Sequence, residues 1–538
     1  MATMVPSQLV DYRPDVTELA ELLVNNPKDV IDRLYRLRDA LFGRSNGPIT
    51  EDSDVEYVEL VSGVFHSFMP ENIADDKDLL PAVDAGIIEF CVDTILNDRY
   101  FLEHKRVQHP HLWCLAALAG RSEQESSQRV AKRLLKIAPS LFECIWRHRS
   151  RLQLEESGIF KDPLAGLVSF YLKVYQSVTN TIAPLNSYLF HVQLFLWLAS
   201  REENVGPALN LSYDFMSRFL CVATGSAKQT GSMPTSLDRE LCNTFIRECI
   251  IEGVGIDRFL SCYEEQLSRL ASGELLPSEH TLSVGYLNPL FNSKLLLPAL
   301  ANRRDILRCG IEALKTMMKA GAENAIVSAW TWCMGAYGDI TKYIRDGYSN
   351  TSGIPVPHLV SMQPEAVDLF ACSVRLAASS QGSGRFILDA PALACLNREL
   401  ADWFYIHCDK FPRGHPLALN ASTVAGLRKV ARLQWWPSLR QLQTVCQTPR
   451  VNAGLSRLLT LWSNFGRVLG LDAEKERIRH EREARLHCSW VDCQYHLENV
   501  PATLLTCKGC GDARYCGRDC QKLDWKHGGH KQACRRLK

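Results

Sequence analysis

The sequence of 538 residues has no excess of charge of either sign and no long hydrophobic run. Its 61 Lys and Arg balance 60 Asp and Glu, so the chain as a whole has no electrostatic attraction for nucleic acid or anionic lipid. The best membrane candidate, residues 189–199, is well under the roughly 20 residues that a span needs, and it contains His191 and Gln193. We therefore expect a buried core helix there and no membrane association.

The first residues, MATMVPSQLVDYRPD, contain neither a basic leader nor the apolar core of a secretion signal. We expect an intracellular protein, with nucleus and cytoplasm both open. Seven of the 20 cysteines lie between residues 488 and 534, and the other thirteen are scattered singly. Scattered cysteines in a reducing compartment are usually small buried side chains, so they predict no disulfide framework.

Signatures of common catalytic sites are also missing. The chain has no Gly-x-Ser-x-Gly and no Gly-x-x-x-x-Gly-Lys-Ser/Thr. It also has no complete His-Glu-x-x-His, because His480-Glu481 is followed by Arg482, Glu483 and Ala484. His407, His415 and the Trp435-Trp436 pair are isolated candidates for a functional site. Such residues more often belong to the surface or the core. We expect no enzymatic activity and no catalytic residues.

From residue 1 to about 470 the chain instead shows a repeated helical pattern. Asn26 can cap a helix that begins at Pro27, where the missing amide hydrogen has no cost, and Gly43 can end it. The apolar face of this helix is formed by Val30, Leu34, Leu37 and Leu41.

The same spacing recurs in residues 307–318, with Asp305 as the candidate cap, and in residues 455–469. Alternating strand patterns with Asn-Gly or Asp-Gly turns are scarce. The predicted fold class is therefore all-α: a long helical region followed by a small cysteine-rich module.

Residues 79–96, LLPAVDAGIIEFCVDTIL, resemble a phrase of armadillo repeats in which one helix ends near Val-x-Ala-Gly and the next begins. This likeness implies stacked helical pairs. The phrase does not recur at the period of about 40–47 residues that a regular armadillo or HEAT array shows. An armadillo-like solenoid and an irregular helical bundle are both open as the architecture of residues 1–470.

The clustered cysteines and one histidine are spaced like zinc ligands. In chain order they are Cys488, Cys493, Cys507, Cys510, Cys516, Cys520, His530 and Cys534. A closed structural zinc site takes four sulfur or imidazole ligands, so eight ligands predict two zinc ions. A peptide of this length buries too little apolar surface to fold alone, and we expect metal to replace a core.

The spacing also predicts local structure around each ligand. Two residues separate Cys507 from Cys510, as in a zinc knuckle, and Gly509 and Gly511 permit positive φ angles and a close approach of backbone amides to the thiolates.

Two later ligand pairs fit short helices. Cys516 and Cys520 can face the same ion if a helix begins near Gly517, and His530 and Cys534 can do so from a later turn. Short helices joined by metal are therefore expected.

Residues 507–525, CKGCGDARYCGRDCQKLDW, followed by HKQAC at 530–534, resemble the MYND zinc finger. Its pattern has six cysteines, a histidine and a final cysteine, with an aromatic residue before the fifth cysteine (here Tyr515) and Gln then Trp after the sixth. The resemblance implies interleaved sites. It assigns Cys488, Cys493, Cys516 and Cys520 to one zinc ion, and Cys507, Cys510, His530 and Cys534 to the other.

The sequence departs from the common pattern in two places. The first cysteine pair has four intervening residues where two are usual, and the gap from Cys520 to His530 is about two residues longer than typical. His527 lies close by and is the alternative ligand. His530 is favoured because it keeps the three-residue spacing to Cys534.

Closed four-ligand sites leave no position for water or substrate, so the finger should be a scaffold. MYND fingers hold short proline-containing peptides, with the Gln and Trp after the sixth cysteine lining the groove. The resemblance thus implies partner-binding roles for Gln521 and Trp525. An indole that stacks on proline beside an amide that bonds to the backbone suits such a ligand. The alternative is that Trp525 only packs the small core and Gln521 only caps it.

The predicted organisation is an α-helical region over residues 1–470, a charged connecting helix at 471–487 and the finger at 488–534. Residues 475–538 contain 14 Lys and Arg against 8 Asp and Glu, but zinc-bound thiolates offset part of this charge, so nucleic-acid binding is not expected. The predicted function is a zinc-binding adaptor that docks a protein partner through a proline-containing peptide.

Two alternative functions stay open. The finger can be purely structural, with partners bound by the helical region. MYND fingers also occur in protein lysine methyltransferases, but those enzymes place the finger inside the catalytic domain and carry an Asn-His-containing cofactor motif. Here the finger is C-terminal and the sequence has no Asn-His dipeptide, so this alternative is disfavoured.

Overall fold

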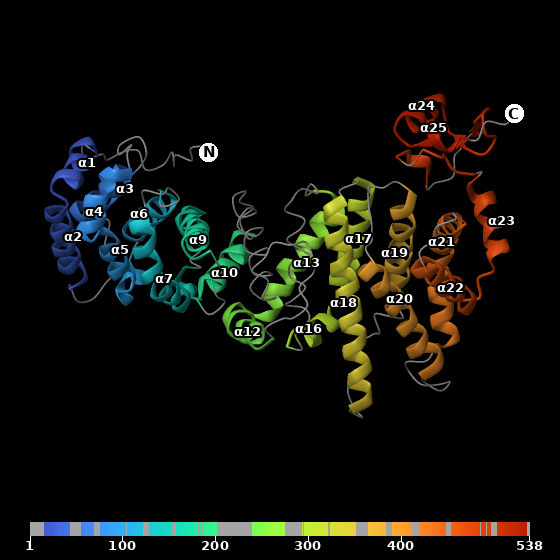
Figure 1. Ribbon diagram of the computed structural model, residues 1–538, viewed down its shortest axis with the longest axis horizontal. Helices are drawn as coiled ribbons and strands as arrows, with labels where there is room; N and C mark the ends of the chain where they lie inside the picture. Colours follow the sequence, from blue (N-terminus) through green and yellow to red (C-terminus); the bar gives the residue numbers. More distant parts are fainter. Residues whose placement is uncertain are drawn as a thin grey trace. The chain divides into compact units, whose positions relative to one another are not determined.

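The computed structural model is helical apart from one two-stranded sheet, within the residues that it describes (Figure 1). The all-α prediction is confirmed. The structure describes residues 16–43, 55–68, 76–103, 105–121, 128–152, 158–180, 183, 187–201, 239–274, 293, 295–320, 323–350, 364–382, 390–410, 419–447, 453–484, 486–490, 492–496 and 503–534.

The chain divides into two compact units, Met1–Asp339 and Ile340–Lys538. Helix α18 (Glu323–Asn350) runs across the boundary. The domain limits predicted at residues 470 and 487 stay predictions, as does the armadillo-like solenoid.

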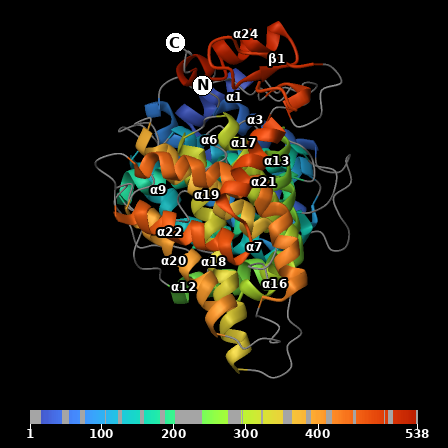
Figure 2. The ribbon, with the colours of Figure 1, turned by 90° about the vertical axis from the view of Figure 1, so that its right-hand side faces the viewer.

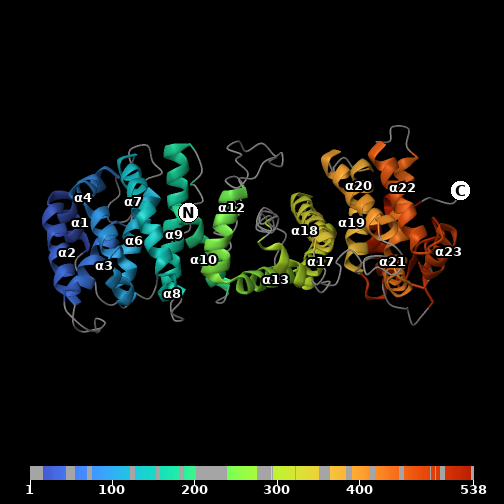
Figure 3. The same cartoon turned by 90° about the horizontal axis from the view of Figure 1, so that it is seen from below.

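The first unit contains a series of α-helices joined by short 3₁₀ and π-helical segments. They are α1 (Val16–Asn25), α2 (Pro27–Phe42), α3 (Val55–Ser67), η1 (Asp76–Leu79), α4 (Leu80–Ala85), α5 (Ile87–Ile95), η2 (Asp98–Leu102), α6 (Lys105–Arg121), α7 (Gln128–Arg147), α8 (Arg149–Leu152), α9 (Gly158–Thr179), α10 (Leu189–Arg201), α12 (Arg239–Phe245), η5 (Ile246–Val254), α13 (Ile256–Ser272), α16 (Leu297–Asn302) and α17 (Arg304–Ala320). Helix α6 packs against α3, α5 and α9, and α13 packs against α17 (Figure 3).

The second unit holds a further group of helices and then the small cysteine-rich module. Its elements are α19 (Pro364–Gly382), α20 (Ala390–Phe404), η8 (Tyr405–Lys410), α21 (Ala421–Cys446), α22 (Ala453–Val468), α23 (Ala473–Ala484), η9 (Gln494–His496), β1 (Leu505–Thr506), β2 (Arg514–Tyr515), α24 (Arg518–Lys526) and α25 (His530–Ala533). Helix α21 packs against α19, α22 and α23 (Figure 2).

Helix α2 has the limits that the sequence predicts, but not the predicted cap. It begins at Pro27, and Val30, Leu34 and Leu41 are buried. The Asn26 side chain does not cap the helix; its amide donates a hydrogen bond to the Asp29 carboxylate at 2.6 Å. The Asp305 cap is also wrong, because α17 already begins at Arg304 and Asp305 pairs with Arg308 in its first turn.

The armadillo-like phrase folds locally as the likeness implies. Helix α4 ends at Ala85, Gly86 adopts φ +104°, and α5 begins at Ile87. This left-handed backbone favours glycine and lets one helix stop and the next begin without a longer loop.

Helix α10 is a core helix, as its interrupted apolar run predicts. His191 and Gln193 are both buried, and the His191 ring packs against Trp146, Tyr188 and Phe245. Burial lowers the pKa of His191 to about 4, so the side chain is neutral at physiological pH. None of the helices searched in the described parts of the chain is long and apolar enough to cross a membrane.

The isolated candidates of the sequence have structural surroundings. His407 is buried against Trp403, Trp435 and Trp436 are buried, and His415 lies outside the described residues. The scattered cysteines that the structure describes form no disulfide; most are buried or half-buried, and Cys408 is the exposed exception. Cys221 and the side chain of Cys242 lie outside the described part of the chain.

Two tryptophans join α21 to α22 by reciprocal hydrogen bonds. The Trp435 indole N–H donates to the Trp462 carbonyl at 2.9 Å, and the Trp462 indole N–H donates to the Trp435 carbonyl at 3.3 Å. Gly466 in α22 lets the helices approach this closely, because a Cβ there would overlap the Trp435 ring. The contact thus joins α21 and α22 closely, before α23 and the cysteine-rich module in the chain.

Replacing Gly466 tests this contact. Gly466→Ala forces Trp435 out of place, and overpacking of this kind costs about 1–3 kcal/mol, so we expect the thermal unfolding midpoint to fall by ~2–12 °C. Gly426→Ala is the matched control, because this exposed glycine in α21 has open space around it and the helix gains from alanine. Differential scanning fluorimetry measures both midpoints. Equal midpoints for the two variants would contradict the proposed close contact.

Candidate metal centre

A β-hairpin forms the middle of the cysteine-rich module. Strand β1 pairs antiparallel with β2, with Leu505 opposite Tyr515 and Thr506 opposite Arg514. The turn between the strands carries Cys507 and Cys510. The hairpin thus presents two ligands at its tip, and α24 and α25 follow directly in the chain.

The tip of the hairpin is the predicted zinc knuckle. The Gly511 N–H donates to the Cys507 carbonyl at 2.9 Å, and Gly511 has φ +72°. Gly509 has no positive φ, so that part of the prediction is wrong; its role is one of space. A Cβ at Gly509 would lie 3.0 Å from the Cys534 sulfur. Glycine here therefore lets the last ligand reach the knuckle.

Cys488, Cys493, Cys516 and Cys520 form the first cluster, in which all four sulfurs lie within 4.8 Å of one another. The Cys516 sulfur is 3.4 Å from those of Cys493 and Cys520. Four sulfurs at ~2.3 Å from zinc in a tetrahedron lie about 3.8 Å apart, whereas a disulfide requires about 2.05 Å. The cluster therefore fits a tetrahedral zinc ion and contains no disulfide.

Cys507, Cys510, His530 and Cys534 form the second cluster. His530 Nε2 lies 3.3 Å from the Cys507 sulfur and 3.8 Å from the Cys510 sulfur, and the Cys507 and Cys534 sulfurs are 4.0 Å apart. His527 only follows the end of α24 and is not in the cluster. The structure thus selects His530, and the two clusters have the interleaved membership that the family resemblance implies.

The charges of the thiols also favour a cation in each cluster. Burial acts to raise the pKa of Cys507, but hydrogen bonds from the Cys510 backbone N–H and with His530 outweigh it and lower the pKa to about 6. Partial burial and the hydrogen bond with Cys507 raise the pKa of Cys534 to about 11. One thiolate therefore prevents its neighbour from ionising, and a dication removes this conflict because it stabilises all the thiolates together.

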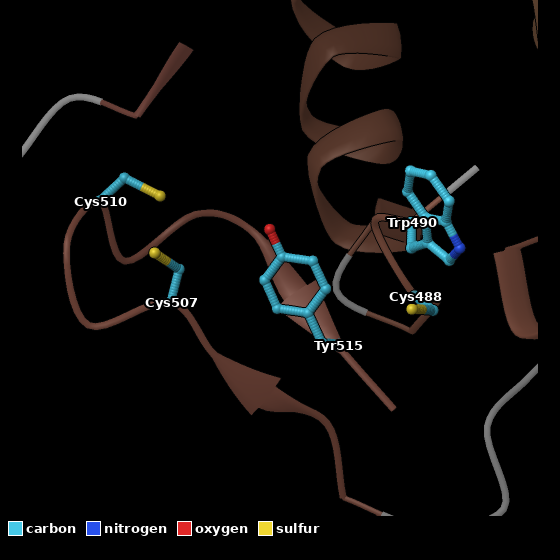
Figure 4. Close-up of a cluster of buried hydrophobic side chains, with 5 residues drawn as sticks. All are labelled: Cys488, Trp490, Cys507, Cys510 and Tyr515. Atoms are coloured by element: carbon cyan, nitrogen blue, oxygen red, sulfur yellow. The ribbon is translucent and has the colours of Figure 1, made fainter. Parts of the chain in front are cut away.

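Tyr515 lies at the centre of the small core between the clusters. Figure 4 shows its ring between the Cys507–Cys510 pair and Cys488, with Trp490 beyond. The phenol donates a 2.8 Å hydrogen bond to the buried Asp524 carboxylate, and burial together with this carboxylate raises the pKa of Tyr515 well above its usual value. The bond ties β2 to α24.

The sequence analysis missed the roles of Asp524 and Trp490. Asp524 is only 6 % exposed, and a Cβ at Gly528 would overlap its carboxylate. An acidic residue in a strongly charged helix gives no sign of burial, since its partner Tyr515 lies nine residues earlier in another element. Trp490 could have been noticed, because a tryptophan between the first two ligands is an unusual surface residue.

Gln521 and Trp525 lie on one face of α24, four residues apart, and both are half-buried. The Trp525 ring packs edge-on against His530, with ring centres 5.9 Å apart. No hydrogen bond engages the Gln521 side-chain amide within the described part of the module. Trp525 therefore contributes to packing around a ligand, while the Gln521 amide is free to bond elsewhere.

Comparison with known proteins places the module at the residues that carry the two clusters. Residues 488–534 match the family model of the MYND finger. No curated protein and no solved structure matches the chain. With both ligand clusters in place, these residues form a MYND finger, a zinc-binding protein-interaction domain, whose clusters fit two zinc ions.

Zinc content tests the ligand set. We expect two zinc ions per chain by inductively coupled plasma mass spectrometry, and one or fewer in His530→Ala, because the second cluster then lacks its fourth ligand. His530→Cys should retain two, since sulfur is an equally good ligand. The matched control is His527→Ala, which should also keep two. Loss of zinc from His527→Ala, or its retention in His530→Ala, would reverse the assignment.

Proposed function

We propose that this protein is a non-catalytic adaptor whose finger docks a short proline-containing peptide of a partner through Gln521 and Trp525. The ligand sets of the finger support the absence of catalysis at the metal. Each cluster already supplies four protein ligands, which completes a tetrahedral zinc shell and leaves no position for a substrate. The metal then acts on function only through the surface that it stabilises.

The observation that supports docking best is the placement of Gln521 beside Trp525 on the outer part of α24. Helix α24 is held from its inner side by Cys520 and by the Tyr515–Asp524 hydrogen bond. Its outer side therefore keeps a fixed orientation without needing a partner. A half-exposed indole can stack on proline rings, and a free amide beside it can bond to the extended peptide backbone.

The hairpin edge adds a second element that suits an extended peptide. Both residues of β1 are exposed, and Leu505 is 43 % exposed. In a two-stranded sheet each strand has one unpaired edge, and such an edge can accept a further strand.

Selected peptides can test this docking site. We suggest selecting from a displayed library of 12-residue peptides with two fixed prolines on the full-length, zinc-loaded protein, and measuring affinity by fluorescence anisotropy. Trp525→Ala should bind the selected peptides at least about 30-fold more weakly, since a buried aromatic anchor contributes ~2 kcal/mol or more. Gln521→Ala should weaken binding by about 2- to 10-fold, through one lost hydrogen bond.

Two controls separate docking from structure. Zinc content must stay at two ions in Trp525→Ala, because Trp525 also packs against His530. Leu523→Ala is the matched surface variant: this leucine is 41 % exposed on another side of the same helix, and its loss should leave affinity unchanged. Equal binding by Trp525→Ala and the wild type would transfer the docking role to the helical region.

The methyltransferase alternative has a separate test. Incubation of the purified protein with a labelled methyl donor and histone mixtures should give no incorporation above a Cys488→Ser control. Clear incorporation by the wild type would overturn the non-catalytic assignment.

A further inference from the structure

Three basic residues lie beside Gln521 and Trp525 on α24. Arg518, Lys522 and Lys526 follow one another at intervals of four, so they form a row along the helix. Gln521 lies three residues after Arg518, and Trp525 three residues after Lys522, so the docking pair occupies the adjacent row. We call the three basic residues the basic row of α24.

The basic row is exposed and almost without internal partners. All three side chains are exposed. Lys522 makes one ion pair, at 3.9 Å with Asp519, in which the two side chains are 75 % and 93 % exposed, and solvent makes such a contact weak. Arg518 and Lys526 take part in no ion pair among the described residues. These charges therefore contribute little to holding the finger together.

The basic row is also not placed to offset the negative charge of the zinc-binding thiolates. Cys520 and Asp524 face the interior from the opposite side of α24, about 160° round the helix from Lys522. On that inner side the Asp524 carboxylate accepts the Tyr515 hydrogen bond, and the Cys520 sulfur lies 3.4 Å from that of Cys516 in the first cluster. The row faces solvent and lies beside any peptide that binds to Gln521 and Trp525.

We propose that the peptide docked by the finger carries acidic residues beside its proline-containing segment, and that the basic row binds them. This inference rests on the proposed function and adds the charge of the partner to it. A partner held by prolines alone would gain nothing from the row. A carboxylate one or two residues from the stacked proline would reach a Lys or Arg that is already in place, which gives both affinity and a faster encounter. One row of three charges is a small footprint for nucleic acid, whose affinity depends on many phosphate contacts.

The peptides selected on the wild-type protein provide the test. We expect Asp and Glu to be enriched in them over the starting library. For the tightest peptide, a twin in which every Asp is Asn and every Glu is Gln should bind about 3- to 30-fold more weakly at low salt, because two or three exposed ion pairs are lost. The difference should shrink when the salt is raised to about 0.5 M.

A triple variant and a matched control localise the effect. Arg518→Ala, Lys522→Ala and Lys526→Ala together should make the acidic peptide and its amide twin bind equally, with two zinc ions retained. Lys475→Ala should preserve the difference, because Lys475 is an exposed lysine of α23 outside the finger.

The outcomes distinguish the two proposals. If peptides bind in a Trp525-dependent manner but the acidic peptide is no tighter than its twin, the basic row is rejected and the docking site stands. If peptides bind equally to Trp525→Ala, or none is selected, both are rejected. If a 20-base-pair DNA duplex binds more tightly than the acidic peptide and the triple variant loses it, the row is a nucleic-acid contact instead.

Discussion

The finger depends on the need to hold seven thiols and one imidazole close together. The sulfurs of the first cluster approach to 3.4 Å, and without a cation such thiols suppress one another's ionisation, as the opposite shifts in the pKa of Cys507 and Cys534 show. The apolar core around them is small, centred on Trp490 and Tyr515. Structural zinc contributes about 10–16 kcal/mol of apparent binding energy in finger peptides, so the metal, rather than the core, accounts for a stable finger.

Because metal stabilises the finger, the exposed side chains of α24 can have few contacts within the module. Cys520 and the Tyr515–Asp524 hydrogen bond fix the helix from within, so its outward side chains are not needed for stability. We propose that Gln521 and the basic row of α24 serve a partner, and that Trp525 does so in addition to packing against His530. The described helical parts of the chain have no metal cluster to hold them. There, contacts such as that of α21 with α22 depend on buried side chains, among them Trp435 and Trp462.

Those parts of the fold that depend on local sequence could be predicted. The periodic apolar positions give α2 and α22, and the ligand spacing gives the knuckle and the short helices of the finger. The pairing of ligands into clusters could not be derived from spacing and required the family resemblance. Contacts between distant positions, such as Trp435 with Trp462 or Tyr515 with Asp524, depend on the path of the chain between them, which no local pattern records.

The interleaved order of the ligands has a consequence for how the protein responds to zinc supply. Each cluster closes a loop that contains one ligand pair of the other cluster, so a chain with one ion cannot hold both hairpin and helices in place. Loading the second ion is therefore favoured once the first is bound, and the fraction of competent protein rises with zinc concentration more steeply than for one independent site. The surface that we propose for docking is then complete only in a finger that holds both ions.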